Sequence, residues 1–256
     1  MKAVVVATVG TTHPLAFAGL PHALLALADE GVRPVCVVAG VSAQDAVHVL
    51  ARAPVDPATI AAQFAALEAA GVGAFHVGAL LAEPSVRAVA DGLATFAEVP
   101  VVVDPVLAAS GGEPLADEPT RLALRDLLLP RATLLTPNLA EAGALLGRPV
   151  EDLAGMREAA RALIAFGVRC VLVKGGHLDG DPVDVFADAW SVRELRAPRL
   201  PGSLRGTGDL LAVSAAAALA RGAAPLQAVE HGRARVRAAL AEAQPFAGTF
   251  VRRLGP

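Results

Sequence analysis

The feature that most constrains the fold is a recurrent alternation of short β-branched runs with helical segments rich in alanine and leucine. Residues 2–9 form a continuous run rich in β-branched residues, which is typical of a strand buried on both faces. Residues 15–30 then have helical composition and end at Gly31, and similar pairs follow along the chain with short connections. This alternation predicts an α/β fold with a doubly wound, mostly parallel sheet and helices on both faces.

The same patterns predict where the individual elements lie. Strands are expected over 2–9, 33–40, 74–78, 99–103, 132–135 and 169–174, with a hairpin over 183–188 and 192–195. Helices are expected over 15–30, 57–70, 84–96, 119–129, 139–146, 155–166, 210–220 and 226–243. Residues 41–52 have no helical stripe and are interpreted as a loop with a short strand. Since we find no repeat or linker, we expect one domain over residues 1–256.

Composition excludes several classes of protein. Apolar residues make up 54% of the chain and charged residues 18%, which is enough for a large core and excludes disorder. The net charge of −3, without a basic block, makes nucleic acid an unsuitable partner. Cys36 and Cys170 lie in apolar runs and are interpreted as buried free thiols, which fits a reducing cytoplasm. No apolar stretch is long enough to predict a membrane span.

Polar residues gather where the expected strands end. Asp104 follows one strand, Asn138 and Glu141 follow the next, Lys174 follows a third, and Gly10 follows the first. In doubly wound sheets, ligands bind outside the carboxyl ends of the strands. These residues are therefore expected to converge on one ligand site.

The segment Gly206-Thr207-Gly208-Asp209 precedes an alanine-rich helix. Glycines let a ligand approach the backbone closely, and the free N–H groups and dipole of a helix start attract phosphate. A carboxylate beside a phosphate needs another role, such as taking a proton from an attacking hydroxyl group. The alternative is that Asp209 merely caps the helix.

Asn138 and Glu141 have the spacing of a capping box, the simplest interpretation of this pair. The functional alternative is that Glu141, together with Asp104, organises water around a magnesium ion, which takes few protein ligands. Asp104 could equally form a strand-ending turn before Pro105. Both interpretations remain open at this point.

Lys174-Gly175-Gly176 ends a strand in a flexible turn. The lysine could neutralise a nucleotide phosphate, or it could be a solvated strand end. His13, His22, His48, His76 and His231 have no metal-ligand spacing and are interpreted mostly as surface or satisfied histidines. The sequence lacks both G-x-G-x-x-G and G-x-x-x-x-G-K-[ST], which argues against a dinucleotide fold and a P-loop.

Four segments resemble the ribokinase-like superfamily in order and spacing: residues 103–107 (VDPVL), 135–142 (LTPNLAEA), 171–178 (VLVKGGHL) and 206–209 (GTGD). Within it the chain resembles the hydroxymethylpyrimidine/phosphomethylpyrimidine kinases most, with pyridoxal kinases next. Residues 42–45 (SAQD) are similar to that family's T-A-Q-N stretch. The resemblance covers nearly the whole chain.

The resemblance implies a site. Asp209 would be the general base, and Gly206, Thr207 and Gly208 would form the anion hole for the transferring phosphoryl group. Lys174, Gly175 and Gly176 would lie near ATP, and Asp104, Asn138 and Glu141 would organise Mg²⁺, through water. Gln44 would bind the substrate ring beside Gly10 and Val106. The implied substrate is a small heterocyclic alcohol, a homodimer is left open, and this division of roles suits phosphoryl transfer.

Two departures from the family pattern stand out. The pyrimidine kinases usually carry Cys after Gly-Thr-Gly, where this chain has Asp209 as sugar and pyridoxal kinases do. Their N-terminal G-S-D-S-G-G-A-G-I-Q-A-D signature is altered here over residues 10–23 (GTTHPLAFAGLPHA). Two alternatives therefore stay beside the pyrimidine kinase: a pyridoxal kinase-like enzyme and a catalytically impaired ligand-binding relative.

Overall fold

The computed structural model describes residues 3–176, 178 and 180–253. His177, which directly follows Lys174-Gly175-Gly176, lies outside the described residues. Over the described part of the chain the strands form a nine-stranded sheet of order β3-β2-β1-β4-β5-β6-β7-β8-β9. The strands are β1 (Val5–Thr11), β2 (Arg33–Gln44), β3 (Val49–Pro54), β4 (Val72–Val77), β5 (Val101–Val103), β6 (Leu134–Leu135), β7 (Val171–Val173), β8 (Val183–Ala187) and β9 (Val192–Arg196).

The centre of the sheet is parallel and its edges are antiparallel. Strands β2, β1, β4, β5, β6 and β7 pair in parallel, whereas β3 pairs antiparallel with β2, and β8 and β9 complete the other edge. The doubly wound, mostly parallel sheet predicted from the sequence is thus confirmed. The strand order reverses between β1 and β4, the kind of switch point at which such sheets bind ligands.

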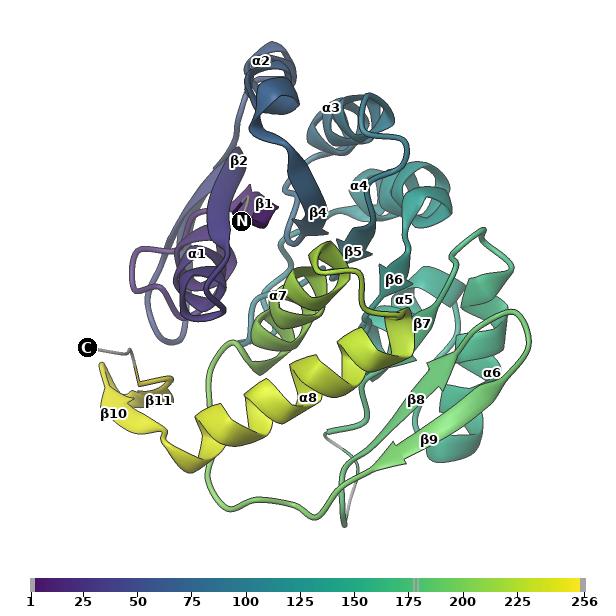
Figure 1. Cartoon of the computed structure of the whole chain (residues 1–256). Coiled ribbons are helices and arrows are strands. Elements are labelled where there is room, and N and C mark those ends of the chain that lie inside the picture. The colour runs from purple at the N-terminus through teal and green to yellow at the C-terminus, as the bar shows by residue number, and fades with distance from the viewer. Residues whose placement is uncertain (1–2, 177, 179, 254–256) are drawn as a thin grey trace.

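Helices cover both faces of the sheet (Figure 1). They are α1 (Gly19–Asp29), α2 (Pro57–Leu67), α3 (Glu83–Ala94), α4 (Glu118–Ala123), α5 (Leu139–Leu146), α6 (Leu153–Ile164), α7 (Thr207–Ala220) and α8 (Pro225–Ala241). One apolar cluster joins the sheet to α2–α6, and a second joins the opposite face to α1, α7 and α8. In the described residues we find no helix long and apolar enough to cross a membrane.

Three local predictions were wrong. Gly10 and Thr11 were expected to follow the first strand but belong to β1, because both pair with β2. The helix expected from residue 15 begins only at Gly19. Residues 41–44 extend β2 and pair antiparallel with β3, where a loop with a short strand was expected. Their neighbours Val47 and Leu50 are solvent-exposed, so no buried stripe marks this hairpin in the sequence.

A short C-terminal hairpin, β10 (Gln244–Phe246) and β11 (Thr249–Val251), was not predicted. It follows α8 and lies near the loop between β1 and α1: the rings of Phe17 and Phe246 meet edge to face with centroids 6.0 Å apart (Figure 1). The Arg205 N–H also donates to the Phe250 carbonyl. The hairpin therefore supports two segments that border the pocket described below.

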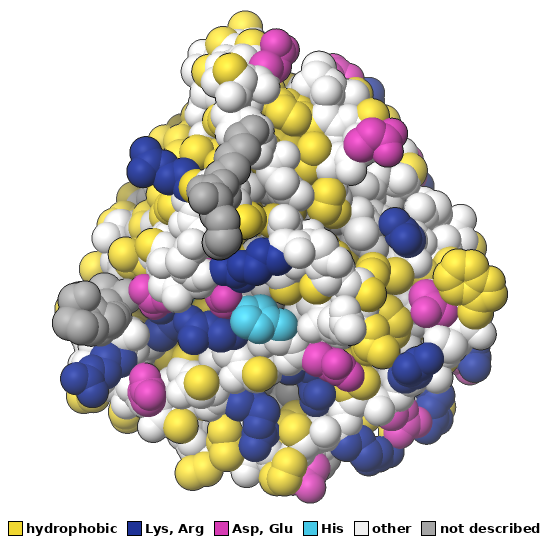
Figure 2. Space-filling model, viewed as in Figure 1, with side chains coloured by type: hydrophobic (Ala, Val, Ile, Leu, Met, Phe, Trp, Pro, Cys, Tyr) yellow, Lys and Arg dark blue, Asp and Glu magenta, His cyan; other side chains and the backbone are white. Residues whose placement is uncertain are grey.

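Acidic and basic side chains are interspersed over the molecular face that carries α8 (Figure 2). On this face, the charges do not gather in a patch of one sign. This arrangement agrees with the small net charge of −3.

Candidate active site

A row of polar side chains crosses five neighbouring strands on the face covered by α7. Thr8 lies on β1 and His76 on β4, while Asp104, Thr136 and Lys174 directly follow β5, β6 and β7. Each stands two residues after an apolar side chain of the core beneath α7, namely Val6, Ala74, Val102, Leu134 and Leu172. Since side chains alternate along a strand, the five polar groups face the same side as those apolar residues.

Asp104 and Lys174 form a largely buried ion pair within this row. The Lys174 ammonium donates to Asp104 Oδ1 at 2.8 Å, and the Thr136 hydroxyl donates to the same oxygen at 2.9 Å. Burial lowers the pKa of Lys174, but the carboxylates of Asp104 and Glu141 outweigh burial, so its pKa stands above the usual value. Lys174 is thus a fixed cation, and the alternative of a solvated strand end is wrong: its side chain is 15% exposed.

The turn before α7 lies against this pair. Gly206 has a φ of 75°, and a Cβ there would lie 2.3 Å from the Phe17 carbonyl oxygen, so only glycine fits. A Cβ at Gly208 would lie 2.9 Å from Lys174 Nζ. The first N–H groups of α7, a helix of 14 residues, therefore lie close to Gly208 and to the Lys174 ammonium. Free N–H donors, a positive charge and space for close approach are what an anion site requires.

Asp209 does not cap α7. The N-cap is Gly206, without a side-chain hydrogen bond, and Asp209 lies within the first turn. Its Oδ2 lies 2.8 Å from His22 Nδ1, and its Oδ1 lies 3.6 Å from His76 Nε2. His76 in turn shares a hydrogen bond with Thr8 through Nδ1, and burial, opposed by Asp209 and Asp104, lowers its pKa. Asp209 is therefore a carboxylate held between two histidines.

Asn138 and Glu141 form the capping box that their spacing indicates. Asn138 Oδ1 accepts from the Glu141 N–H at 2.9 Å, and Glu141 Oε2 accepts from the Asn138 N–H at 2.7 Å. Burial raises the pKa of Glu141 to about 7, although the positive charge of Lys174 acts in the opposite direction. A cation bound nearby would favour the ionised form of this carboxyl group and lower its pKa.

The residues expected to organise Mg²⁺ have the chemistry that a divalent cation requires. Asp104 and Glu141 offer carboxylate oxygens, the donors that Mg²⁺ prefers, and both influence the charge of Lys174. Ligand atoms of His76, Asp104 and Asp209 also lie within 4.8 Å of one another. The described residues thus fit a divalent cation at the edge of the sheet, and the side chain of Asn138 serves as a cap.

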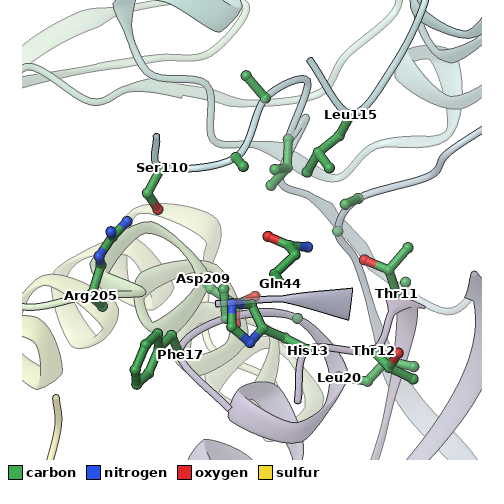
Figure 3. Close-up of a pocket in the computed structure, with 18 of the residues that line it drawn as sticks. Thr11, Thr12, His13, Phe17, Leu20, Gln44, Ser110, Leu115, Arg205 and Asp209 are labelled. Atoms are coloured by element: carbon green, nitrogen blue, oxygen red, sulfur yellow. The ribbon is translucent and has the colours of Figure 1, made fainter. Parts of the chain in front are cut away.

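A pocket opens beside Asp209 at the β1/β4 switch point. The residues predicted to bind substrate, Gly10, Gln44 and Val106, all line it together with Asp209. Figure 3 shows His13, Gln44 and Asp209 directed toward the middle of the pocket. The Gln44 side chain is oriented by Ser42, because its amide Nε2 donates to Ser42 Oγ at 2.7 Å.

The first glycine after Lys174 has a structural role. A Cβ at Gly175 would lie 2.0 Å from the Val183 carbonyl oxygen, and the Gly175 N–H donates to Asp184 Oδ1. Gly175 therefore permits the close approach of β7 and β8, whereas Gly176 is exposed. A role of either glycine in ATP binding stays a prediction.

Sequence reasoning missed several groups around the pocket. His22 and His76, interpreted as surface or satisfied histidines, both border Asp209. His13, Phe17 and Arg205 line the same pocket, and burial together with Arg205 lowers the pKa of His13. For His76 the alternation of side chains along β4 is a signal, because it puts His76 on the same face as Thr8 and Asp104 once the strand order is known. For the loop residues His13, Phe17 and Arg205, the local sequence offers no such signal.

The geometry places a carboxylate of the pocket wall at the start of a helix, close to side chains whose charges suit an anion and a cation. A hydroxyl group held beside Asp209 would lose its proton to that carboxylate as its oxygen attacks an electrophile at the start of α7. The arrangement is suited to transfer of a phosphoryl group to an alcohol.

Comparison with known proteins gives the same assignment. Residues 15–251 match the sequence model of the family described as phosphomethylpyrimidine kinase. A hydroxymethylpyrimidine/phosphomethylpyrimidine kinase of Mycobacterium bovis is 40% identical over 238 residues, which cover 90% of this chain and 85% of that protein. A thiamine biosynthetic bifunctional enzyme of Arabidopsis thaliana is 37% identical over 88% of this chain and 44% of its own length.

Among solved structures, an ADP complex of Bacillus subtilis pyridoxal kinase superimposes with a TM-score of 0.90. It is 26% identical and the match covers 99% of this chain and 98% of that chain. The family match spans α1, α7 and the strands from β2 to β9, whereas β1 and the site residues Thr8, Gly10 and His13 precede it. The chain therefore belongs to the phosphomethylpyrimidine kinase family of phosphotransferases.

Proposed function

We propose that this protein transfers the γ-phosphoryl group of ATP to hydroxymethylpyrimidine, its monophosphate, or both, as a kinase of thiamine biosynthesis. The observation that carries the proposal is the position of Asp209, at the start of α7 and in the wall of the pocket that contains Gln44. The base and the group that reads the acceptor ring thus share one pocket, next to an anion site. Family membership supports the choice of substrate.

The acceptor half of the pocket is mainly uncharged. Gln44 offers an amide, the natural partner of a pyrimidine with both donors and acceptors on its edge. Gly10 leaves space beside it, since no atom lies within 3.5 Å of a Cβ built there, and Val106 supplies an aliphatic wall. The ring is placed among these groups with its hydroxymethyl arm toward Asp209.

The transfer step needs the other half of the site. Asp209 takes the proton of the acceptor hydroxyl as its oxygen attacks the γ-phosphorus, the bond to the bridging oxygen breaks, and ADP leaves. The N–H groups of Gly206, Thr207 and Gly208 and the Lys174 ammonium face the negative charge of the transferring group.

Asp104 and Glu141 are the residues that would hold Mg²⁺, through water, with Asn138 fixing Glu141. When bound there, Mg²⁺ would neutralise phosphate charge. The protein's own residues limit the negative charge here: of the two carboxylates, that of Asp104 is neutralised directly by its ion pair with Lys174. We also place the activity in one cytoplasmic kinase domain over residues 1–256; Gly175 and Gly176 would border the nucleotide.

A pyridoxal kinase-like activity is the second candidate, because Asp209 follows Gly-Thr-Gly and the pyridoxal kinase fold matches closely. The test is an assay with ATP and Mg²⁺ in which hydroxymethylpyrimidine and pyridoxal compete, with products identified by mass spectrometry. We expect the phosphorylated pyrimidine to dominate. Dominant pyridoxal phosphate would support the second candidate.

The same assay addresses the third alternative, a ligand-binding relative without turnover. Such a protein would bind ATP and the pyrimidine but consume no ATP in their presence. A related kinase run in parallel as a positive control makes absence of product meaningful, and that result would contradict the proposed function.

A further inference from the structure

The two departures from the family pattern contact each other. His22 belongs to the altered stretch 10–23, and Asp209 replaces the usual cysteine after Gly-Thr-Gly. In the structure, His22 Nδ1 lies 2.8 Å from Asp209 Oδ2 although 187 positions separate them. Both side chains are buried, with 6% and 9% of their surfaces exposed. Two changes that look independent in the sequence thus form one contact in the fold.

The surrounding backbone fits this contact. His22 lies near the start of α1, which packs beside α7. A Cβ at Gly206 would lie 3.0 Å from His22 Cε1 and 3.3 Å from Nδ1. The glycine that begins the anion site therefore also makes room for the imidazole ring, so the ring cannot be replaced freely by a larger group.

The contact divides the roles of the two Asp209 oxygens. Oδ2 is held by His22, whereas Oδ1 lies 3.6 Å from His76 Nε2, beyond hydrogen-bond range. His76 Nε2 is buried without a hydrogen-bond partner among the described residues, so it does not compete for Oδ1 in a short bond. An ionised carboxylate only accepts hydrogen bonds, so His22 donates from Nδ1.

We propose that His22 is a positioning residue that fixes the rotamer of Asp209 by donating to Oδ2, which leaves Oδ1 to take the proton of the acceptor hydroxyl. The inference rests on the proposed kinase function. A free carboxylate at the start of a helix could rotate toward the phosphate site or toward Lys174. Holding one oxygen from α1 keeps the other at the pocket, and misplacement of a reacting group by about 1 Å can lower a rate about 100-fold.

The test compares two replacements of His22. His22→Leu removes the donor and keeps an apolar side chain, whereas His22→Asn keeps an N–H donor near the position of Nδ1. We expect His22→Leu to lower kcat about 10- to 100-fold with KM for ATP changed less than about twofold. His22→Asn should recover kcat to within about threefold of the wild type. Equal losses in both variants, or no loss in His22→Leu, would overturn the proposal.

A matched control removes a similar contact elsewhere. His231 Nε2 lies 2.9 Å from Glu30 Oε2, remote from the pocket, and Arg221 and Arg235 also pair with Glu30. His231→Leu should leave kcat unchanged. Thermal unfolding and ADP binding of each variant show whether the fold is retained.

A double-mutant cycle separates positioning from a purely structural effect. In an Asp209→Asn background, His22→Leu should lower kcat by less than about threefold, because the group it positions is already disabled. A full additional loss would overturn the proposal.

The contact can also be measured without turnover. In ¹⁵N NMR spectra of the full chain, the His22 Nδ1–H signal should move on Asp209→Asn, and an unchanged signal would overturn the proposal. An inactive wild type that shows this shift would contradict the kinase function and leave the contact established, so the two failures are distinguishable.

Discussion

Glu141 shows how burial and charge oppose each other at a single residue. Its side chain is needed as a backbone cap, yet its burial raises its pKa to about 7 against an ordinary 4.5. The folded protein therefore holds this proton more tightly than the unfolded chain. Its contribution to stability is greatest below about pH 4.5 and is lost as the pH rises to about 7.

Glu141→Gln keeps a cap acceptor but cannot ionise. We expect the free energy of unfolding of the wild type to fall relative to Glu141→Gln between pH 5 and pH 8, measured by urea denaturation with EDTA present. The exposed Glu98→Gln is the matched control and should show no such trend. A wild type that gains stability over this range relative to Glu141→Gln would contradict the assigned direction.

Gly206 and Gly208 belong to the same motif, but replacing each by alanine should affect stability differently. Gly206→Ala forces a φ of 75° on alanine against a carbonyl oxygen, and should destabilise the fold by about 1–3 kcal/mol. Gly208→Ala meets only the end of Lys174 and should change stability by less than about 1 kcal/mol, the usual Gly–Ala helix difference.

Activity should separate these two variants as well. By displacing the Lys174 ammonium, Gly208→Ala should lower kcat at least about 10-fold. Removal of one charge-stabilising donor commonly lowers kcat more, by about 10²–10³-fold. Chemical denaturation and initial rates check both expectations. A stable, fully active Gly208→Ala variant would show that Lys174 is not engaged in transfer.

At the scale of elements, the C-terminal hairpin supports the pocket through one aromatic pair. Phe246 is half-exposed and packs on Phe17, which lines the pocket. Such a pair contributes about 0.5–1.5 kcal/mol, so Phe246→Ala should raise KM for the acceptor about 2- to 10-fold with kcat little changed.

Phe250→Ala is the control on the same hairpin. Phe250 is similarly exposed, and its carbonyl contact with the Arg205 N–H survives the substitution. Steady-state kinetics should show an unchanged KM for this variant. Equal KM values for Phe246→Ala and the wild type would mean that the hairpin does not support the site.

The elements that the sequence predicted best are those with local signals. The helix over 139–146 was predicted with its observed bounds, because Asn138, Glu141 and Gly147 mark its ends. The extension of β2 and its pairing with β3 were missed because β3 is exposed along nearly its whole length, so no buried stripe marks it. The hairpin β10–β11 was missed because a three-residue strand has no measurable period.

The candidate site was predictable where a motif follows a strand end, as at Asp104 and Lys174, or begins a helix, as at Asp209. It was not predictable where the partner comes from a distant element: nothing local to His22 indicates that it meets Asp209, since only the packing of α1 on α7 creates the contact. Strand alternation could have assigned His76, but only after the order of β1, β4 and β5 was known.

At the scale of the whole molecule, the strand order places the two halves of the site. The β1/β4 switch point opens the acceptor pocket, and the carboxyl ends of β5, β6 and β7 bring Asp104 and Lys174 to the start of α7. Asp209 is the residue in which the two halves meet. The proposed kinase activity of this protein therefore depends on that carboxylate.

The most direct test measures turnover of hydroxymethylpyrimidine with ATP and Mg²⁺ by the wild type and by Asp209→Asn. The account predicts a phosphorylated pyrimidine from the wild type. In Asp209→Asn it predicts a kcat about 10²–10⁴ lower, the usual effect of a positioned base, with ADP binding retained. Equal kcat values in the two proteins would contradict the role of Asp209, and a wild type that phosphorylates no pyrimidine would contradict the proposed function.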